Sequence, residues 1–311
     1  MVMNLEQLRG FVEVARLGHF TRASEHLHLA QPSLSRQIST LERELGAELF
    51  HRARGHISLT AAGETLLPRA QRMLADADAI RDEMGELAGL RRGRVRLGAP
   101  PTLCISLVAE AVSSFHAAYP DVDLHLTESG SRLLVEQLAV GAVDIALITA
   151  SDGLPPAGVS LTRMPLLAEE LVVVSSAAEP PLTDGPAIDL ERLAALPLIT
   201  FGESYELRAT TDAAFREAGL TPHPVLEGAE MDTALRFVER GLGVAVVPAM
   251  VLFDRPGLRS VRLSHPMMTR TVSLAHRSDV TPAIAVAAMR KAIVSTSAEV
   301  ARRDPAITSL L

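Results

Sequence analysis

The stretch AQPSLSRQISTLERELG, residues 30–46, predicts an amphipathic helix with a polar outer face. Its apolar stripe, at the spacing i, i+4, i+7, i+11, consists of Leu34, Ile38, Leu41 and Leu45. Pro32 fits the first turn, where its missing N–H leaves no hydrogen bond unmade. The opposite face near the helix start consists of hydrogen-bonding side chains: Gln31, Ser33, Ser35, Arg36 and Ser39. Such side chains can read base edges and bind phosphates, although an ordinary surface helix would carry the same pattern.

The residues before this stretch predict two further helices. An apolar stripe begins at Leu5 and ends near Gly18. Thr21 is then expected to cap a short helix that runs from Arg22 to Leu27. A short helix followed by a second helix with a polar N-terminal face is typical of a helix-turn-helix, in which the second helix lies in the major groove of DNA.

Residues 49–60, LFHRARGHISLT, predict two short strands around a basic tip that contains a glycine. A hairpin in this position is the wing of a winged helix-turn-helix. Arg52 and Arg54 could enter a minor groove from it. The alternative is a solvated hairpin tip with no DNA contact.

The charge of the chain is unevenly distributed. The 311 residues carry a formal net charge of −7, which by itself argues against a nucleic-acid partner. Residues 1–96, however, carry 14 arginines and 12 acidic residues, whereas residues 97–311 carry 16 basic and 25 acidic residues. A local basic patch is sufficient to neutralise phosphates. The length predicts two or three compact units, and the charge asymmetry suggests that they have different tasks.

A long helix is predicted from Thr60, its N-cap, to about Leu90. It contains Pro68, which should remove one helical hydrogen bond. A seven-residue repeat of apolar residues runs along it: Leu66, Ala70, Met73, Ala77, Ile80, Met84 and Leu87. Such a repeat is typical of a coiled-coil seam, so we expect this helix to pair with a second copy of the chain. The alternative is a helix that packs on its own domain.

From residue 95 short apolar strands alternate with helices. The first series has strands at 95–98, 122–126 and 145–148, with helices up to Tyr119 and at 133–140. The loop 151–158 breaks the pattern. A second series has strands at 171–175, 198–201, 223–226 and 244–247, helices at 209–218 and 233–240, and then a strand at 270–276 and a helix at 282–297. This alternation predicts an α/β fold with parallel strands and right-handed crossovers.

Three corners at the carboxyl ends of these strands carry hydroxyl groups: Pro100-Pro101-Thr102, Ser129-Gly130-Ser131 and Thr149. Ligands of open α/β sheets bind at such corners, where free N–H groups and a hydroxyl can hold an anion or a carboxylate. Phe201 and Tyr205 lie at the matching corner of the second series and could add an apolar wall. The hydroxyl residues would also serve as ordinary helix caps.

The motifs of several enzyme classes are missing. The chain has no GxSxG, no phosphate-binding loop, no HExxH and no CxxC. Gly241-Leu242-Gly243 follows a predicted helix, so it predicts a helix stop and not a dinucleotide loop. The single lysine, Lys291, lies away from every ligand corner, which argues against a Schiff-base enzyme. We therefore expect no enzymatic activity, no metal site and no cofactor.

The single cysteine, Cys104, excludes an internal disulfide and fits a reducing cytoplasm. It lies near a predicted helix start, but without an evident partner we expect a buried small hydrophobe and not a reactive thiol. No run of 18 apolar residues occurs, and MVMNLEQLRG has no signal-peptide pattern. A cytoplasmic location without membrane contact is expected.

The chain closely resembles the LysR-type transcriptional regulators. The resemblance is strongest over residues 3–68, in LEQLRGFVEVARLGHFTRASEHLHLAQPSLSRQISTLERELGAELFHR and LTAAG. From 91 to 297 it is looser and rests on RVRLGAPP, GAVDIALI and GLGVAVVP. It implies a multidomain α+β protein with three parts: a winged helix-turn-helix over residues 1–60, a dimerising linker helix over 61–90 and an α/β, two-lobed, periplasmic-binding-protein-like effector domain over 91–311. It places lobe I at about 91–164 and 268–300, and lobe II at about 165–267.

The resemblance also implies site residues and partners. Operator-reading positions match Gln31, Pro32, Ser35 and Arg36, and the expected DNA-binding set is completed by Thr21, Ser33, Arg52 and Arg54. The wing departs from the family pattern, because Gly55 stands where an arginine is usual and Arg54 precedes it. Positions that often line the effector cleft match Thr102, Ser131, Thr149, Phe201 and Asp232. The implied partners are double-stranded operator DNA and a small inducer, which we expect to be anionic or a carboxylate. Further copies of the chain are expected in a homodimer or a dimer-of-dimers tetramer. RNA polymerase is left open as a partner.

Two other classes of function compete with a ligand-responsive transcription factor. One is a solute-binding module with a vestigial helix-turn-helix, against which the basic wing and Arg36 argue. The other is a helix-turn-helix fused to an enzyme, against which the missing catalytic motifs argue.

Overall fold

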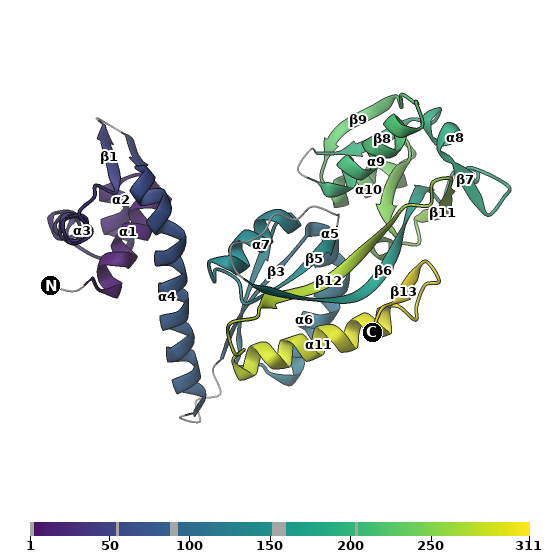
Figure 1. Cartoon of the computed structure of the whole chain (residues 1–311). Helices are drawn as coiled ribbons and strands as arrows, with labels where there is room; N and C mark the ends of the chain where they lie inside the picture. Colours follow the sequence, from purple (N-terminus) through teal and green to yellow (C-terminus); the bar gives the residue numbers. More distant parts are fainter. Residues whose placement is uncertain (1–2, 54–55, 88–92, 151–159, 203–204) are drawn as a thin grey trace. The chain divides into compact units, whose positions relative to one another are not determined.

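The computed structural model describes residues 3–53, 56–87, 93–150, 160–202 and 205–311 (Figure 1). The chain divides into two compact units, one of residues 1–93 together with 136–143 and one of residues 94–135 and 144–311. Each unit has its own hydrophobic core. The division into two units agrees with the two or three compact units that the length predicts.

Three helices form the first part of the N-terminal unit: α1 (Leu5–Leu17), α2 (Phe20–His26) and α3 (Gln31–Leu45). The Asn4 side chain caps α1 by accepting from the backbone N–H of Gln7 at 3.0 Å, and Gly18 ends the helix with a φ of +63°. In the turn between α2 and α3, His28 has a φ of +54°. These helices confirm the predicted helix-turn-helix.

The start of the second helix differs from the prediction. The cap of α2 is His19, whose Nδ1 accepts from the backbone N–H of Thr21 at 3.2 Å. Thr21 is therefore an exposed residue of the first turn and not the cap. The usual preference for hydroxyl and amide caps does not single out a histidine, although its ring nitrogen can accept in the same way.

Helix α3 buries most of its predicted stripe. Leu34, Ile38 and Leu41 are fully buried, but Leu45 is 43% exposed, so its predicted burial was wrong. Leu45 is the last residue of α3, and Gly46 turns the chain with a φ of +69° immediately beyond it. The periodic spacing thus continues one turn past the hydrophobic core.

The predicted wing and long helix follow α3. Strands β1 (Phe50–Ala53) and β2 (His56–Leu59) pair antiparallel, while Arg54 and Gly55 at the tip lie outside the described residues. In α4 (Ala61–Leu87) the cap is Thr60, whose Oγ1 accepts from the N–H of Gly63 at 3.1 Å. A Cβ atom on Gly63 would lie 2.2 Å from the carbonyl oxygen of Leu49, so only glycine lets α4 begin against the wing.

The heptad residues of α4 fall into two groups. Ala70 is fully buried and Leu66 is half-buried against the core of the helix-turn-helix. Farther along, Met73, Ile80 and Met84 are 43%, 59% and 55% exposed. The helix start therefore packs on its own unit, as the alternative interpretation predicts. The later heptads present an apolar row to solvent, and their pairing with a second copy of the chain stays a prediction.

The C-terminal unit is organised by a nine-stranded mixed sheet of order β4-β3-β5-β12-β6-β11-β7, with β10 and β13 also paired to β6. Its strands are β3 (Arg94–Ala99), β4 (Asp123–Glu128), β5 (Ile145–Ala150), β6 (Leu161–Ser176), β7 (Ala187–Asp189), β10 (Ala245–Pro248), β11 (Leu258–Ser264), β12 (Thr269–Arg277) and β13 (Ile307–Ser309). Strands β8 (Leu198–Phe201) and β9 (Pro224–Ala229) form a separate parallel pair.

Helices cover this sheet in two lobes. Lobe I contains α5 (Pro101–Leu103), which continues through a π-helical turn into α6 (Ala109–Ala118), together with α7 (Ser131–Ala139) and α11 (Ile284–Val300). Lobe II contains α8 (Leu190–Ala194), α9 (Glu206–Glu217) and α10 (Met231–Glu239). Strand β6 belongs to both: its first ten residues pair with β12, and its last six pair with β10 and β11 (Figure 1).

The strand assignment from the sequence is right for the parallel part and incomplete elsewhere. β3 pairs parallel with β4 and with β5, as predicted. However, β6, β10, β11 and β12 pair antiparallel, and the first half of β6 together with β7, β11 and β13 was missed. These segments are short or carry charges and a proline, so they lack the apolar runs on which the prediction depended.

One helical stretch in the described part of the chain, Pro101–Ala118, meets the length and composition of a membrane span, with a mean hydropathy of 1.2. The stretch is not an uninterrupted apolar run, because polar residues such as Ser106, Glu110 and His116 interrupt it. Leu103, Leu107 and Phe115 of this stretch are buried in the core of lobe I. Since core helices pass the same test, this stretch is weak evidence for a membrane span.

The exposed row of α4 generates a prediction about assembly. Replacing Ile80 by Asp would bury an unpaired carboxylate if two α4 helices pair along this row, and such burial is strongly unfavourable. Sedimentation should then show loss of the dimer. Thr65, exposed on α4 and distant from the apolar row, provides the control: Thr65→Asp should sediment like the wild type. An Ile80→Asp protein that keeps its full oligomeric size would contradict the pairing.

Candidate functional site

The N-terminal face of α3 is the first candidate site. Gln31, Ser33 and Arg36 are exposed and Ser35 is half-buried, with Pro32 exposed in the first turn. The cap residue of α3 is Ala30, which makes no side-chain cap bond. Within the described part of the chain, Arg36 forms no ion pair and no side-chain hydrogen bond. The polar residues of this face are therefore available to an outside partner.

The structure places the remaining predicted DNA-binding residues in the same unit. Thr21 is exposed in the first turn of α2, and the backbone of Arg52 pairs with Ile57 in the wing. Arg54 lies outside the described residues, so its predicted contact with DNA stays a prediction. The Oε1 of Glu42 accepts from the backbone N–H of Leu49 at 3.0 Å, which joins the end of α3 to the base of the wing.

The second candidate site is a cleft between the lobes of the C-terminal unit, with a volume of about 270 Å³. Lobe I contributes residues from each of the three predicted corners: Pro100, Pro101, Thr102, Ser129, Gly130 and Thr149. Lobe II contributes Tyr205, Glu206, Leu207 and Glu230, and Arg270 comes from β12. The fold thus brings together corners that are up to 47 residues apart in the sequence, between Thr102 and Thr149.

Two buried hydroxyl residues are joined at this cleft: Thr149 is one of its lining residues, whereas Ser131 is not but contacts Thr149. Ser131, which begins α7, is fully buried, and Thr149 on β5 is 5% exposed. The backbone N–H of Thr149 donates to Oγ of Ser131 at 3.0 Å, and the two hydroxyl oxygens are also 3.0 Å apart. The predicted pair is therefore preorganised by its own hydrogen bonds.

A carboxylate of the chain itself, that of Glu206, accepts hydrogen bonds from these two residues. The backbone N–H of Ser131 donates to Oε1 of Glu206 at 3.2 Å, and the Thr149 hydroxyl donates to Oε2. Both carboxylate oxygens of Glu206 therefore accept hydrogen bonds from lobe I. The sequence does not predict Glu206 at this site, because the corners suggest donors and an acceptor 75 residues away gives no local signal.

Arg270 forms the cationic side of the cleft. Its Nη1 donates to Oγ1 of Thr102 at 2.9 Å, and its Nε donates to Oε1 of Glu169 at 2.8 Å. Glu169 is 1% exposed, and its Oε2 accepts from the backbone N–H of Met250 at 3.1 Å. The charge of Arg270 is thus balanced by a buried carboxylate before any ligand is considered.

Two lobe II residues complete the wall. The Tyr205 hydroxyl donates to Oε2 of Glu230, and burial together with this carboxylate raises the pKa of Tyr205. Phe201, 3% exposed, packs with its ring centroid 5.5 Å from that of Tyr205. Asp232 is exposed and forms an ion pair with Arg255. Of the predicted effector-binding residues, Thr102 and Thr149 line the cleft, whereas Ser131, Phe201 and Asp232 are not among the described residues that line it.

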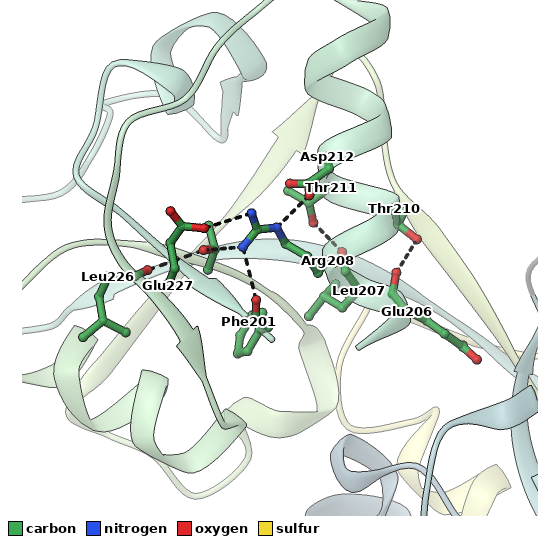
Figure 2. A network of polar contacts seen from close by, with 10 residues as sticks. Phe201, Glu206, Leu207, Arg208, Thr210, Thr211, Asp212, Leu226 and Glu227 are labelled. Carbon is green, nitrogen blue, oxygen red and sulfur yellow. Dashed lines mark hydrogen bonds and ion pairs between the residues drawn. The ribbon is translucent and has the colours of Figure 1, made fainter. Parts of the chain in front are cut away.

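Figure 2 shows that the first turn of α9 separates two polar groups. The Arg208 guanidinium donates to Asp212 at 2.7 Å and to Thr200 at 2.7 Å, and it also contacts Glu227. The Glu206 side chain points away from this network (Figure 2). Arg208 therefore does not neutralise Glu206, and no other cation of the described residues forms an ion pair with it.

A larger groove, of about 530 Å³, lies beside β11 in lobe II. It contains two arginines, but Arg262 pairs with Glu170, and Arg259 donates to the carbonyl oxygens of Ala177 and Glu179. None of the predicted site residues lines it. The cleft between the lobes is therefore the stronger candidate.

Redox and metal chemistry find little support in the described residues. Burial, with a further contribution from Glu128, raises the pKa of the half-buried Cys104 thiol to about 12. The reactive form of a cysteine is the thiolate, so this thiol is poorly suited to nucleophilic chemistry. No group of three or more His, Cys, Asp or Glu residues in the described ranges could hold a metal ion.

The sequence matches two parts of one known family. Residues 5–64 match the family described as "Bacterial regulatory helix-turn-helix protein, lysR family", and residues 88–298 match the "LysR substrate binding domain". The uncharacterized HTH-type transcriptional regulator YybE of Bacillus subtilis is 33% identical over 273 residues, which cover 88% of this chain and 92% of that protein. The HTH-type transcriptional regulator IlvR of Caulobacter vibrioides is 33% identical over 288 residues, with coverage of 91% and 95%.

A solved structure supports the same assignment. A full-length OxyR variant from Pseudomonas aeruginosa superposes with a TM-score of 0.71 at 28% identity, and the match covers 97% of both chains. The helix-turn-helix, the long helix and the two-lobed unit thus occur together in a related full-length protein. The chain belongs to the LysR family, as a DNA-binding transcriptional regulator with an effector-binding domain.

Proposed function

We propose that this protein regulates transcription by reading operator DNA with the start of α3 and by binding a small carboxylate-bearing effector between the lobes. The observation that supports the effector class is the position of Glu206. A carboxylate of the chain already accepts from the Ser131 N–H and the Thr149 hydroxyl, so these donors are suited to a carboxylate. Thr102 would contribute its hydroxyl, whose oxygen accepts from Arg270 and whose proton can point to a ligand.

The proposed division of labour follows the chain. Residues 1–60 bind DNA, residues 61–90 pair two copies through the exposed row of α4, and residues 91–311 bind the effector. Two such dimers would form a tetramer in the cytoplasm, with RNA polymerase as a further partner to be tested. Effector binding need only favour one arrangement of the lobes to change DNA binding, and couplings of about 1–3 kcal/mol are typical.

The exposed position of Arg36 leads to a prediction about operator recognition. We expect Arg36 to read a base, in the bidentate manner in which arginine recognises guanine. Arg36→Ala should therefore cost about 1–3 kcal/mol of binding to the operator and much less on scrambled DNA. Gel-shift titrations on both DNAs measure this difference. Arg54→Ala is the comparison, because a backbone or minor-groove contact should weaken both DNAs about equally. Equal losses on both DNAs for Arg36→Ala would exclude base reading.

The cleft leads to a second prediction. Thr102→Val keeps the shape of the side chain but removes the hydroxyl, and a hydrogen bond to a charged group contributes about 1.5–3 kcal/mol. A small carboxylate that raises the melting temperature of the full-length protein should therefore bind this variant at least about tenfold more weakly in calorimetry. Operator affinity without the ligand should be unchanged. If Thr102→Val and Ser131→Ala both retain the wild-type ligand affinity, the effector binds elsewhere.

A further inference from the structure

The Ser131 N–H and the Thr149 hydroxyl cannot serve Glu206 and a ligand carboxylate at the same time. Each is one donor, and both are already directed at the two oxygens of Glu206. Ser131 belongs to lobe I and Glu206 to the first turn of α9 in lobe II. A ligand that takes these donors must therefore release Glu206, and with it a direct link between the lobes.

The charges that line the cleft make a simple carboxylate a poor ligand. The ionisable lining residues that the structure describes, apart from Tyr205, are Glu206, Glu230 and Arg270. Arg270 is already paired with Glu169, whose side chain is fully buried. A ligand that brings only a negative charge would place a further carboxylate beside Glu206 and Glu230, and like charges in one site oppose each other.

A cationic group on the ligand removes this conflict. Once displaced, Glu206 remains on the lobe II wall of the cleft, on the same side as Glu230. Glu230 is exposed and its Oε2 accepts from Tyr205, which holds the carboxylate at the cleft. An ammonium or guanidinium group opposite the ligand carboxylate would meet these two acceptors. The volume of about 270 Å³ is just below the usual range of ligand sites and suits a ligand of amino-acid size.

We infer that Glu206 is an internal occupant of the carboxylate site, and that the effector is a zwitterion of amino-acid size whose carboxylate displaces Glu206 and whose cationic group pairs with the lobe II carboxylates. This inference rests on the proposed function, because it assumes that the effector binds in this cleft. Glu206 is then the residue that selects a zwitterion over the corresponding carboxylic acid.

The internal occupant can be tested without knowledge of the effector. Butanoate serves as the probe, and its affinity for the full-length protein is measured from the rise in melting temperature with concentration. Glu206→Ala vacates the donors and removes one negative charge, so butanoate should bind this variant at least about tenfold more tightly than the wild type. Glu227→Ala removes a lobe II carboxylate outside the cleft and should leave butanoate binding at the wild-type level.

The ligand class is tested with matched probes on the same proteins. Each standard L-amino acid is compared with its deaminated acid and its decarboxylated amine. At least one amino acid should bind the wild type at least about tenfold more tightly than either analogue. In Glu206→Ala the advantage over the deaminated acid should shrink at least threefold, whereas Glu227→Ala should preserve it.

The outcomes separate the two proposals. Butanoate that binds the wild type and Glu206→Ala equally, or binds neither, overturns the internal occupant. A panel in which no amino acid binds, or in which deaminated acids bind the wild type as tightly, overturns the zwitterion. In these cases the cleft itself stands if Thr102→Val and Ser131→Ala still weaken the binding of another small carboxylate. If these two variants change the affinity of no ligand that binds, the proposed effector site is wrong.

Discussion

The pairing of β6 with β12 is the constraint on which the C-terminal unit depends. Strand β6 continues from this pairing into lobe II, so the geometry of the cleft is set where the two strands meet. The buried Glu169 on β6 lies in this region and is held by Arg270 of β12 and by the N–H of Met250. A buried ion pair of this kind adds little net stability, but loss of one partner typically costs about 3–5 kcal/mol, because a charge is left buried and unpaired.

The same ion pair prepares the cleft for binding. Arg270 extends from Glu169 to the hydroxyl of Thr102, so a scaffold contact fixes the orientation of a candidate ligand contact. Arg270 does not bring an unbalanced positive charge to an anionic ligand, since its ion pair with Glu169 balances that charge within the protein. The cleft therefore depends on oriented N–H and O–H dipoles for a carboxylate, in the manner of many anion sites in proteins.

The sequence predicts those parts of the molecule in which one local signal decides the structure. The stripe of α3, the caps Gly18 and Thr60, and the parallel strands around β3 follow from periodicity and capping chemistry alone. The first half of β6 does not, because Pro165 and Glu169 interrupt its apolar pattern, and its partners lie about 100 residues away in β12. Its strand character comes from tertiary pairing, which overrides local propensity.

The candidate site was predictable to the same extent. The corners that carry Thr102, Ser131 and Thr149 follow from the order of strands and helices, and Thr102 and Thr149 line the cleft. Glu206 does not follow from the sequence, because its role depends on a contact between lobe II and lobe I. The residues next to Glu206 in the sequence give no signal of that contact. Phe201 was expected in the cleft because it ends a strand, but its ring is buried in the core of lobe II.

The net charge of the effector domain disfavours an anionic ligand, whereas the donors in its cleft favour a carboxylate. The proposed displacement of Glu206 by a zwitterion accounts for both. Residues 97–311 carry 16 basic and 25 acidic residues, so their long-range field repels an anion. The cleft nevertheless contains donors that suit a carboxylate. A zwitterion has no net charge and is hardly affected by the long-range field, yet at close range its carboxylate can take the donors while its cation meets Glu206 and Glu230. Because Glu206 links the two lobes when it occupies these donors, the same exchange that selects the ligand also removes a contact between the lobes, which couples recognition to the shape of the effector domain.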